Sequence, residues 1–511
     1  HQFISQGRAV YATLEPPEKR QFSAEGELVD EHPFFPLRFC RVCGQDYYHV
    51  VRTADRFLPY PVGEELPEEE GQGGYLAFVE DWDESHLPDD WRDEQGRITR
   101  TWRDRMPRPV WVRADGTFST EPIEGTWKAW WQARKFWLCL RCGEYYTERE
   151  QDFTKLSRLS SEGRSSATTV LATAVLRYAA QSGTVRDKLL TFTDSRQDAS
   201  LQAGHFNDFV QMAVLRSGLY AALRQHGELR FDNVARETVR SMGLELRDVA
   251  QNPALDPESS IAQEVWKTFQ DLTEYRLYAD LRRGWRVLQP NLEDTGLLRI
   301  EYDGLREVCE REKVWRDLPP LRERPPEERF RILHAVLDHF RKRLAIEVRV
   351  LEREFQQQLR RRAEQHLNEF WGLDPDADFL YEASWFVRPA GQVRHLPQGV
   401  FYRLTARAPI GRFLREALQL DANELETLLL VFLELLVSQG FLRRGDSLNG
   451  YERYRLDAGC LVWRLGDGTP PPPDPVYARG NREAMPANAF FQRLYQGAAQ
   501  ELASLEAREH T

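Results

Sequence analysis

Two short stretches decide the fold of the first part of this chain: Phe39-Cys-Arg-Val-Cys-Gly44 and Leu138-Cys-Leu-Arg-Cys-Gly143. In each, two cysteines separated by two residues are followed by a glycine and soon after by a tyrosine pair, Tyr47-Tyr48 or Tyr145-Tyr146. Four thiolates presented by two tight turns suit the tetrahedral preference of a structural Zn²⁺ ion. We therefore predict one zinc ion held between two similar hairpins by Cys40, Cys43, Cys139 and Cys142.

Two unrelated pairs of buried thiols are one alternative to a zinc site, and a disulfide framework, which requires an oxidising compartment, is another. The sequence shows no secretory signal peptide, and its richest apolar run, 428–437, is interrupted by Glu434. We expect a cytoplasmic protein without a membrane partner, in which Cys309 and Cys460 are ordinary thiols. A catalytic zinc centre is not expected, because four thiolates leave no coordination position for an activated water.

Length and charge limit the remaining possibilities. A chain of 511 residues is too long for one core, so about three domains are expected. The net charge of −11 argues against a protein that coats nucleic acid by bulk electrostatics, although basic residues cluster at 341–343 and 360–362. The chain begins without Met at His1 and stops just after a helical stretch, so we expect an internal piece of a larger polypeptide.

Composition divides the chain into five segments. The first contains eight of the fourteen tryptophans, short apolar runs and acidic loops, which predicts a β-rich zinc module. Its tryptophans can form the core or stack nucleic-acid bases. The segment after it has a strand, turn and helix pattern, and the third is mainly helical, with its longest helical run at Glu327–Phe370. A polyproline stretch opens the last. The proposed segments are 1–155, 156–225, 226–400, 401–468 and 469–511.

The second segment places polar residues where a strand meets a helix. Lys188–Thr193 has the content of a buried strand, and an amphipathic helix is predicted from Ala199 to about Leu223. The free N–H groups and the dipole of a helix N-terminus form an anion site. Anion binding is one interpretation of the turn between them, and a well-capped turn is the other. The turn residues in question are Ser195, Arg196 and Gln197.

The fourth segment has winged-helix character. A helix near Ile410–Leu418 precedes an apolar helix, Glu424–Gln439, which Asp421 caps and Gly440 ends. Two strands, 441–444 and 451–455, are predicted around a turn at 445–450. The apolar helix carries three glutamates and no Lys or Arg, so it is poorly suited to reading bases. The hairpin arginines can contact phosphates or serve only as solubilising charges. They are Arg443, Arg444, Arg453 and Arg455.

At this point the residues show a family resemblance. Lys188–Phe209 resembles motif IV, the first strand and helix of the second RecA-like domain in large prokaryotic superfamily 2 helicases of the DEAD/DEAH-box class. His1–Gln6 is similar to the exit from the first RecA-like domain of these proteins, and Glu506–Thr511 resembles the stretch before motif V. The resemblance implies a mixed α/β fold, in which a zinc module precedes a partial RecA-like domain carrying a large helical and winged-helix insertion. It also implies a nucleic-acid partner, with DNA expected, and contact of Ser195, Arg196 and Gln197 in motif IV with the nucleic-acid backbone.

Motifs for ATP chemistry are missing from the sequence. No GxxxxGK[ST] phosphate loop occurs, and Asp83-Glu-Ser-His86 spells a DExH box without a buried strand before it. We interpret that box as coincidence. ATP and Mg²⁺ are therefore expected only in a full-length parent, and this chain alone should be inactive. The alternative function is a non-catalytic zinc-ribbon and winged-helix adaptor that binds nucleic acid or a protein.

Overall fold

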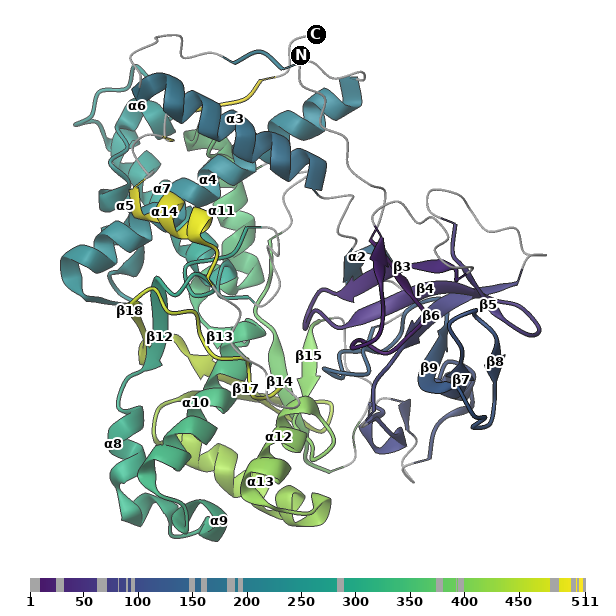
Figure 1. The fold of residues 1–511 in the computed structure, drawn as a ribbon. Coiled ribbons are helices and arrows are strands. Elements are labelled where there is room, and N and C mark those ends of the chain that lie inside the picture. The colour runs from purple at the N-terminus through teal and green to yellow at the C-terminus, as the bar shows by residue number, and fades with distance from the viewer. Residues whose placement is uncertain are drawn as a thin grey trace. The chain divides into compact units, whose positions relative to one another are not determined.

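The chain divides into two compact units, which we describe separately (Figure 1). The first comprises His1–Ala167 with the short pieces Arg407–Pro409 and Tyr477–Arg479, and the second comprises Thr168–Ala406, Ile410–Val476 and Gly480–Thr511. The computed structural model describes residues 10–23, 32–61, 71–80, 82–88, 91–92, 97–146, 152–157, 163–181, 189–191, 196–282, 289–373, 380–391, 393, 399–477, 487–497, 502 and 505–508.

The first unit is built on one ten-stranded antiparallel sheet with the order β2-β1-β3-β4-β6-β9-β7-β8, to which β10 adds beside β3 and β5 beside β4. The strands are β1 (Tyr11–Thr13), β2 (Phe22–Ser23), β3 (Phe34–Cys40), β4 (Asp46–Arg52), β5 (Phe57–Pro59), β6 (Gln72–Ala77), β7 (Arg108–Val112), β8 (Phe118–Ser119), β9 (Trp127–Ala133) and β10 (Leu156–Ser157). Among the described residues of this unit, three short helical turns accompany the strands: η2 (Glu84–His86), α1 (Arg100–Arg103) and α2 (Asp152–Lys155).

The sheet curls around an aromatic core. Alternate residues of each strand face this core, as the two-residue period of a strand requires. Trp131 of β9 reaches Phe57 of β5, with ring centroids 5.3 Å apart. The backbone N–H of Phe57 donates to the carbonyl of Gly116, just before β8, at 2.7 Å, so the far edge of the sheet returns toward β5. Five of the eight tryptophans in this unit are buried: Trp82, Trp91, Trp130, Trp131 and Trp137. Their burial favours a core role over base stacking.

The second unit combines helices with two smaller sheets. The long α4 packs against α5 and α14, and α7 packs against α5 and α11. The helices are α3 (Gly163–Gln181), α4 (Arg196–His226), α5 (Val234–Met242), α6 (Leu246–Val249), α7 (Ser260–Ala279), α8 (Leu305–Glu310), α9 (Pro319–Arg322), α10 (Pro326–Lys342), α11 (Arg353–His366), α12 (Pro409–Leu418), α13 (Ala422–Ser438) and α14 (Ala489–Gly497), with the 3₁₀ turns η4 (Glu312–Trp315), η5 (Arg349–Leu351) and η6 (Ala458–Cys460). None of the described helices is long and apolar enough to cross a membrane.

Among the described residues, the sheets of the second unit have three and five strands. The three-stranded sheet has the order β11-β18-β12, with β18 antiparallel to both neighbours. In the five-stranded sheet β17 is central: β16 pairs with one edge, and β13 and β14 share the other, with β15 beside β14. The strands are β11 (Glu228–Arg230), β12 (Leu298–Tyr302), β13 (Ile346–Glu347), β14 (Trp385–Pro389), β15 (Phe401–Arg403), β16 (Leu442–Leu448), β17 (Tyr451–Asp457) and β18 (Leu461–Leu465).

The helical run expected at Glu327–Phe370 is broken in the middle. After α10 ends at Lys342, Leu344 adopts a left-handed backbone with φ of 53°, and β13 follows. A left-handed branched residue ends a helix because its Cβ crowds the backbone. The side chain of Arg341 is completely buried and pairs with Glu293 and Asp338 at 2.8 Å each, so burial of an ion pair coincides with the end of α10.

The buried strand expected at 188–193 is not formed by the part of it that the structure describes. Residues 189–191 are in no regular element, and 74% of the Leu190 surface is exposed. A strand needs a neighbouring strand to satisfy its backbone groups, and none of the described strands pairs with this segment. The expectation of a buried strand is therefore wrong for residues 189–191, whereas the predicted helix after it is present as α4.

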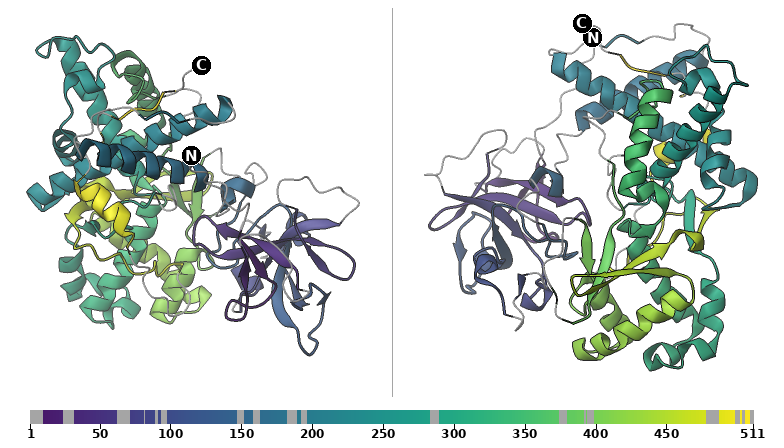
Figure 2. Two further views of the ribbon diagram at one scale, coloured as in Figure 1. Left: turned by 45° about the horizontal axis from the view of Figure 1, so that its top comes forward. Right: turned by 180° about the vertical axis from the view of Figure 1, so that it is seen from behind.

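The winged-helix segment has the expected local order of elements. The side chain of Asp421 caps α13 by accepting hydrogen bonds from the N–H groups of Asn423 and Glu424, at 2.8 and 2.9 Å. The hairpin differs from the expected one, because β16 continues to Leu448 and only Asn449-Gly450 turn, both with positive φ. Figure 2 shows this hairpin beside α13. The fold is thus mixed α/β, and the RecA-like and winged-helix assignments remain predictions.

Candidate metal centre and nucleic-acid interface

The four predicted cysteines converge in the first unit. Their sulfur atoms all lie within 4.8 Å of one another. Sγ of Cys40 is 4.0 Å from Sγ of Cys142, and Sγ of Cys43 is 3.6 Å from Sγ of Cys139. Four sulfurs at the usual Zn–S distance of about 2.3 Å form a tetrahedron with edges of about 3.8 Å. The cluster can therefore hold one metal ion, and its geometry is consistent with structural zinc.

The two cysteine turns have the same backbone design. Cys40 is the last residue of β3, and its carbonyl accepts from the N–H of Gly44 at 2.8 Å, while the carbonyl of Cys139 accepts from Gly143 at 2.9 Å. Both glycines are left-handed, with φ of 72° and 71°. Glycine adopts this conformation without a steric penalty, which is why it follows the second cysteine in both motifs. The similarity expected between the two hairpins is confirmed at this level.

Tyrosines form a second layer around the cysteines. The hydroxyl of Tyr47 donates to Sγ of Cys139 at 3.3 Å and accepts from the N–H of Leu140 at 2.8 Å, so it connects one hairpin to the other. Counted from the glycine, the equivalent residue is Tyr146, whose buried hydroxyl group has a pKa raised by burial and by the nearby Cys40. Two residues separate Gly44 from its tyrosine pair, but only one residue separates Gly143 from the other pair. The first tyrosine of the first pair, Tyr47, is therefore equivalent to the second tyrosine of the other pair, Tyr146.

All six cysteines are free thiols, but only four cluster. Burial raises the pKa of Cys142, whereas hydrogen bonds from Cys139 and Cys142 lower the pKa of Cys43. Cys309 and Cys460 lie in the second unit and are buried, and desolvation raises the pKa of Cys309 to about 12. A thiol with a raised pKa is a weak nucleophile and a weak metal ligand near neutral pH. Both fit the expectation of ordinary thiols.

The arginines of the β16–β17 hairpin lie on two opposite faces of the sheet. Arg443 is paired directly opposite Arg455, and Gly445 opposite Arg453, so these arginines share one face. Trp385 of β14 lies on the same face, with Arg453 and Arg455 stacked 4.5 and 3.7 Å from its ring centroid. Arg403 of β15 lies on this face as well. It is the cross-strand partner of Val387 in β14, and Val387 is in turn the partner of Arg453 in β17, so all three residues face the same side. We name Arg403, Arg443, Arg453 and Trp385 the arginine face. Trp385 and Arg403 were not predicted from the sequence.

Most hairpin arginines have protein partners. Arg443 pairs with Asp457 at 2.6 Å and remains mostly exposed. Arg444, on the opposite face, pairs with Glu452 at 2.5 Å and Glu434 at 3.0 Å. Arg453 donates through Nε to the carbonyl of Asp446 at 2.7 Å and forms no ion pair with any described residue. Arg453 is therefore the hairpin arginine best placed to receive an added anion.

Arg455 is a structural residue rather than a surface one. It is only 5% exposed, and its guanidinium donates to the carbonyls of Ser384 and Ala383 at 3.0 Å each and to the carboxylates of Glu347 and Glu352. These bonds link β17 to η5 and to the entry of β14. The phosphate contact predicted for Arg455 does not fit this burial. Sequence could not reveal it, because the partners are distant along the chain.

The remaining predicted positions are only partly described. Ser195 lies outside the described residues, and Arg196 and Gln197 occupy the first turn of α4, where only the backbone is described. Nucleic-acid contact at this turn stays a prediction. The DExH-like residues lie in and before the short turn η2, where Nδ1 of His86 approaches Oδ1 of Asp83 at 3.2 Å. No described strand leads directly into this box, in keeping with coincidence.

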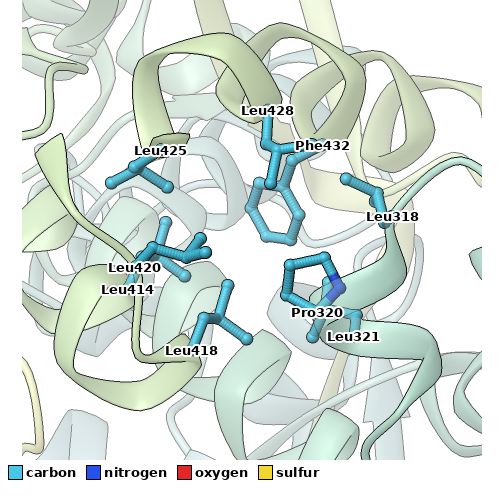
Figure 3. Close-up of a pocket in the computed structure, with 9 residues that line it drawn as sticks. All are labelled: Leu318, Pro320, Leu321, Leu414, Leu418, Leu420, Leu425, Leu428 and Phe432. Carbon is cyan, nitrogen blue, oxygen red and sulfur yellow. The ribbon is translucent and has the colours of Figure 1, made fainter. Parts of the chain in front are cut away.

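A small apolar pocket lies between α9, α12 and α13 (Figure 3). Its lining contains no titratable side chain, so it offers no acid, base or nucleophile. The lining residues are Leu318, Pro320, Leu321, Leu414, Leu418, Leu420, Leu425, Leu428 and Phe432.

No protein-family model, no curated protein and no solved structure matches this chain. Function is therefore inferred from the residues themselves.

Proposed function

We propose that this chain is a zinc-stabilised, nucleic-acid-binding part of an ATP-dependent superfamily 2 helicase or translocase. The observation that carries nucleic-acid binding is the arginine face, which gathers Arg443, Arg453 and Arg403 beside Trp385. Guanidinium groups bind phosphates through several parallel N–H donors. The helicase assignment rests on the resemblance of residues 188–209 to motif IV.

The metal is proposed to be a structural Zn²⁺ ion. Cys40, Cys43, Cys139 and Cys142 would supply all four ligands, and no open position would remain for chemistry. Cys40 ends a central strand, so the ion would tie β3 to the segment after β9. A small β-rich unit gains much of its stability from such a link.

Phosphate binding at the arginine face would use two of its arginines, Arg443 and Arg453, which have few acidic partners among the described residues. The terminal nitrogens of Arg453 donate to no described residue, and Arg443 pairs with one carboxylate, that of the partly buried Asp457. Because Arg443 itself is mostly exposed, exchanging its partner costs little, since surface ion pairs contribute about 0–1 kcal/mol. The backbone of a nucleic acid could thus replace Asp457 without disturbing the sheet.

The second candidate is a non-catalytic adaptor that contacts a protein partner. The observation favouring it is the pairing of Arg443 and Arg444 with acidic residues, together with three glutamates on α13. These features reduce the positive potential available for a polyanion. Loss or retention of nucleic-acid binding separates the two candidates.

The test measures binding of a labelled single-stranded oligodeoxynucleotide to the whole chain by fluorescence anisotropy at several salt concentrations. Arg443→Ala with Arg453→Ala should weaken binding by about 1–3 kcal/mol and flatten its salt dependence. Arg444→Ala is the matched control, because Arg444 lies on the opposite face of the same hairpin. Equal effects of both variants, or no binding by the native chain, would favour the adaptor.

A further inference from the structure

The indole of Trp385 reaches across two strands of the five-stranded sheet. Trp385 precedes Phe386 of β14, the cross-strand partner of Tyr454, so its backbone lies opposite Arg455 of β17. Its ring nevertheless extends over β17 as far as β16. A Cβ atom placed on Gly445 would lie only 2.7 and 2.8 Å from the ring atoms Cη2 and Cζ3. The ring therefore rests directly on the backbone of β16 at Gly445.

Gly445 provides space for this ring and is not required by the backbone. Its φ is not positive, so the conformation of the chain does not demand glycine at this position. A Cβ atom cannot approach a ring carbon within 3 Å, so a side chain at 445 would displace the indole. Glycine inside a strand often marks a place where another group approaches the backbone closely. Gly445 thus positions Trp385.

Two arginines hold the ring in this position. The guanidinium of Arg455 lies 3.7 Å from the ring centroid, and that of Arg453 lies 4.5 Å from it. Arg455 is buried and fixed by hydrogen bonds to backbone carbonyls and carboxylates, so it covers the inward side of the ring. Trp385 itself is only half-buried. Part of a restrained indole is therefore presented on the same face as Arg443 and Arg453.

We propose that the exposed part of Trp385 stacks on one unpaired nucleobase whose neighbouring phosphates are bound by Arg443 and Arg453, so that the arginine face selects single-stranded over double-stranded nucleic acid. The inference rests on the proposed function for phosphate binding, and it adds contact with the base. Guanidinium groups reach phosphates in either form of nucleic acid. The bases of a duplex are stacked on one another, whereas an unpaired base offers a free ring face to an aromatic side chain. A ring that is already held in place loses little conformational freedom when a base stacks on it.

The experiment compares three labelled probes on the whole zinc-loaded chain across a salt series. They are a 20-residue oligothymidylate, an oligomer of equal length built from stable abasic residues, and a 20-base-pair duplex. The native chain should bind the oligothymidylate about tenfold more tightly than the abasic oligomer, because only the former has bases to stack. It should also bind the oligothymidylate more tightly than the duplex.

Variants test the ring and its position separately. Trp385→Leu should raise Kd for the oligothymidylate about tenfold and leave its salt slope and the Kd for the abasic oligomer unchanged, because it removes a ring and no charge. Trp385→Phe retains a ring and should lose less. Gly445→Ala should reproduce the loss by displacing the indole, whereas Gly497→Ala is the matched control, since no described atom lies within 4 Å of its Cβ position. Zinc content and the circular dichroism spectrum should be unchanged in all four.

The outcomes distinguish base stacking from phosphate binding. Equal native affinity for the oligothymidylate and the abasic oligomer, or an unchanged Kd in Trp385→Leu, would overturn stacking, and a persisting loss in Arg443→Ala with Arg453→Ala would leave phosphate binding in place. An equal loss on both single-stranded probes in Trp385→Leu would make Trp385 only a support for Arg453 and would also overturn stacking. Tighter native binding of the duplex would overturn the selection of single strands. Absence of binding by the native chain would overturn the proposed function as well.

Discussion

The hydroxyl of Tyr47 donates a hydrogen bond to Sγ of Cys139 at 3.3 Å, although the two residues belong to different cysteine turns. The same hydroxyl accepts from the N–H of Leu140 at 2.8 Å, so the direction of its own proton is fixed toward sulfur. Hydrogen bonds to a metal-bound thiolate orient the ligand and stabilise its charge. Tyr47 thereby links the two cysteine turns directly.

Removing this hydroxyl should weaken metal binding. We expect Tyr47→Phe to reduce zinc affinity by roughly 10–100-fold, as found for partners of metal ligands generally. The measurement is competition for zinc with a chromophoric chelator at pH 7. Tyr48→Phe is the matched control, since Tyr48 is equally buried but donates to the carbonyl of Glu15. Equal affinity in Tyr47→Phe and the native chain would contradict the role of the bond.

The ligand assignment itself predicts one zinc per chain. Cys40→Ser and Cys139→Ser should each lose the metal in elemental analysis, because a three-thiolate remnant binds zinc far more weakly. Cys309→Ser and Cys460→Ser should keep full zinc, since both residues lie outside the cluster. Full zinc in either of the first two variants would disprove the four-cysteine site.

Acid should destabilise the second unit through the cluster at the end of α10. Burial alone would raise the pKa of Asp338, but Arg341 and Lys342 beside it lower that pKa below its ordinary value. The pKa of Glu293 is lowered in the same way by Arg341. A depressed carboxyl pKa contributes stability above its unfolded value of about 4, and this contribution is lost as the pH falls through the lower, folded value.

Thermal unfolding from pH 7 to pH 2 checks this expectation. The native chain should lose stability steeply below about pH 4. Asp338→Asn should lower the free energy of unfolding by about 3–5 kcal/mol at pH 7, because it leaves Arg341 buried beside only one carboxylate. The stability of this variant should also fall less steeply with decreasing pH than that of the native chain. Asp303→Asn is the control, since Asp303 pairs with an exposed arginine. If the stabilities of the native chain and of Asp338→Asn fell equally steeply as the pH is lowered below about 4, the role of the cluster would be refuted.

Arg455 should matter for folding and not for nucleic-acid binding. Arg455→Lys keeps the charge but cannot reach two carbonyls and two carboxylates at once, so we expect a loss of about 2–4 kcal/mol in the free energy of unfolding. Chemical denaturation supplies the measurement. Oligonucleotide affinity measured where the variant is folded should match the native value. If Arg455→Lys were as stable as the native chain but bound the oligonucleotide more weakly, Arg455 would contact the nucleic acid after all.

ATP turnover is expected only in a longer protein. Phosphoryl transfer requires a phosphate loop, a carboxylate that holds Mg²⁺ and an arginine at the γ-phosphate, and the sequence contains no phosphate loop. The purified chain should show no ATPase activity stimulated by nucleic acid in a coupled assay. Robust activity that depends on Asp83 and Glu84 would instead make the DExH-like box a functional motif.

Local signals in the sequence were sufficient for several features. The cysteine spacing with its following glycine predicts the two turns, because both are formed by hydrogen bonds between residues a few positions apart. The cap at Asp421 and the end of α13 before the left-handed Gly440 depend on similarly short contacts. Nothing local shows that Trp385 joins the hairpin arginines, since that neighbour comes from another strand.

The sequence by itself therefore determined where the two cysteine turns and the helix cap occur, since each is formed by hydrogen bonds between residues a few positions apart. Only the tertiary structure brings the two cysteine pairs together, because the contacting cysteines lie 96 and 102 residues apart in the chain. The tertiary structure alone decided which charges are buried and which face outward. Arg341 and Arg455 look like members of basic surface patches in the sequence, yet both are buried against acidic partners far along the chain. It also decided that residues 189–191 do not form a buried strand, because a strand exists only beside another strand that supplies its hydrogen bonds.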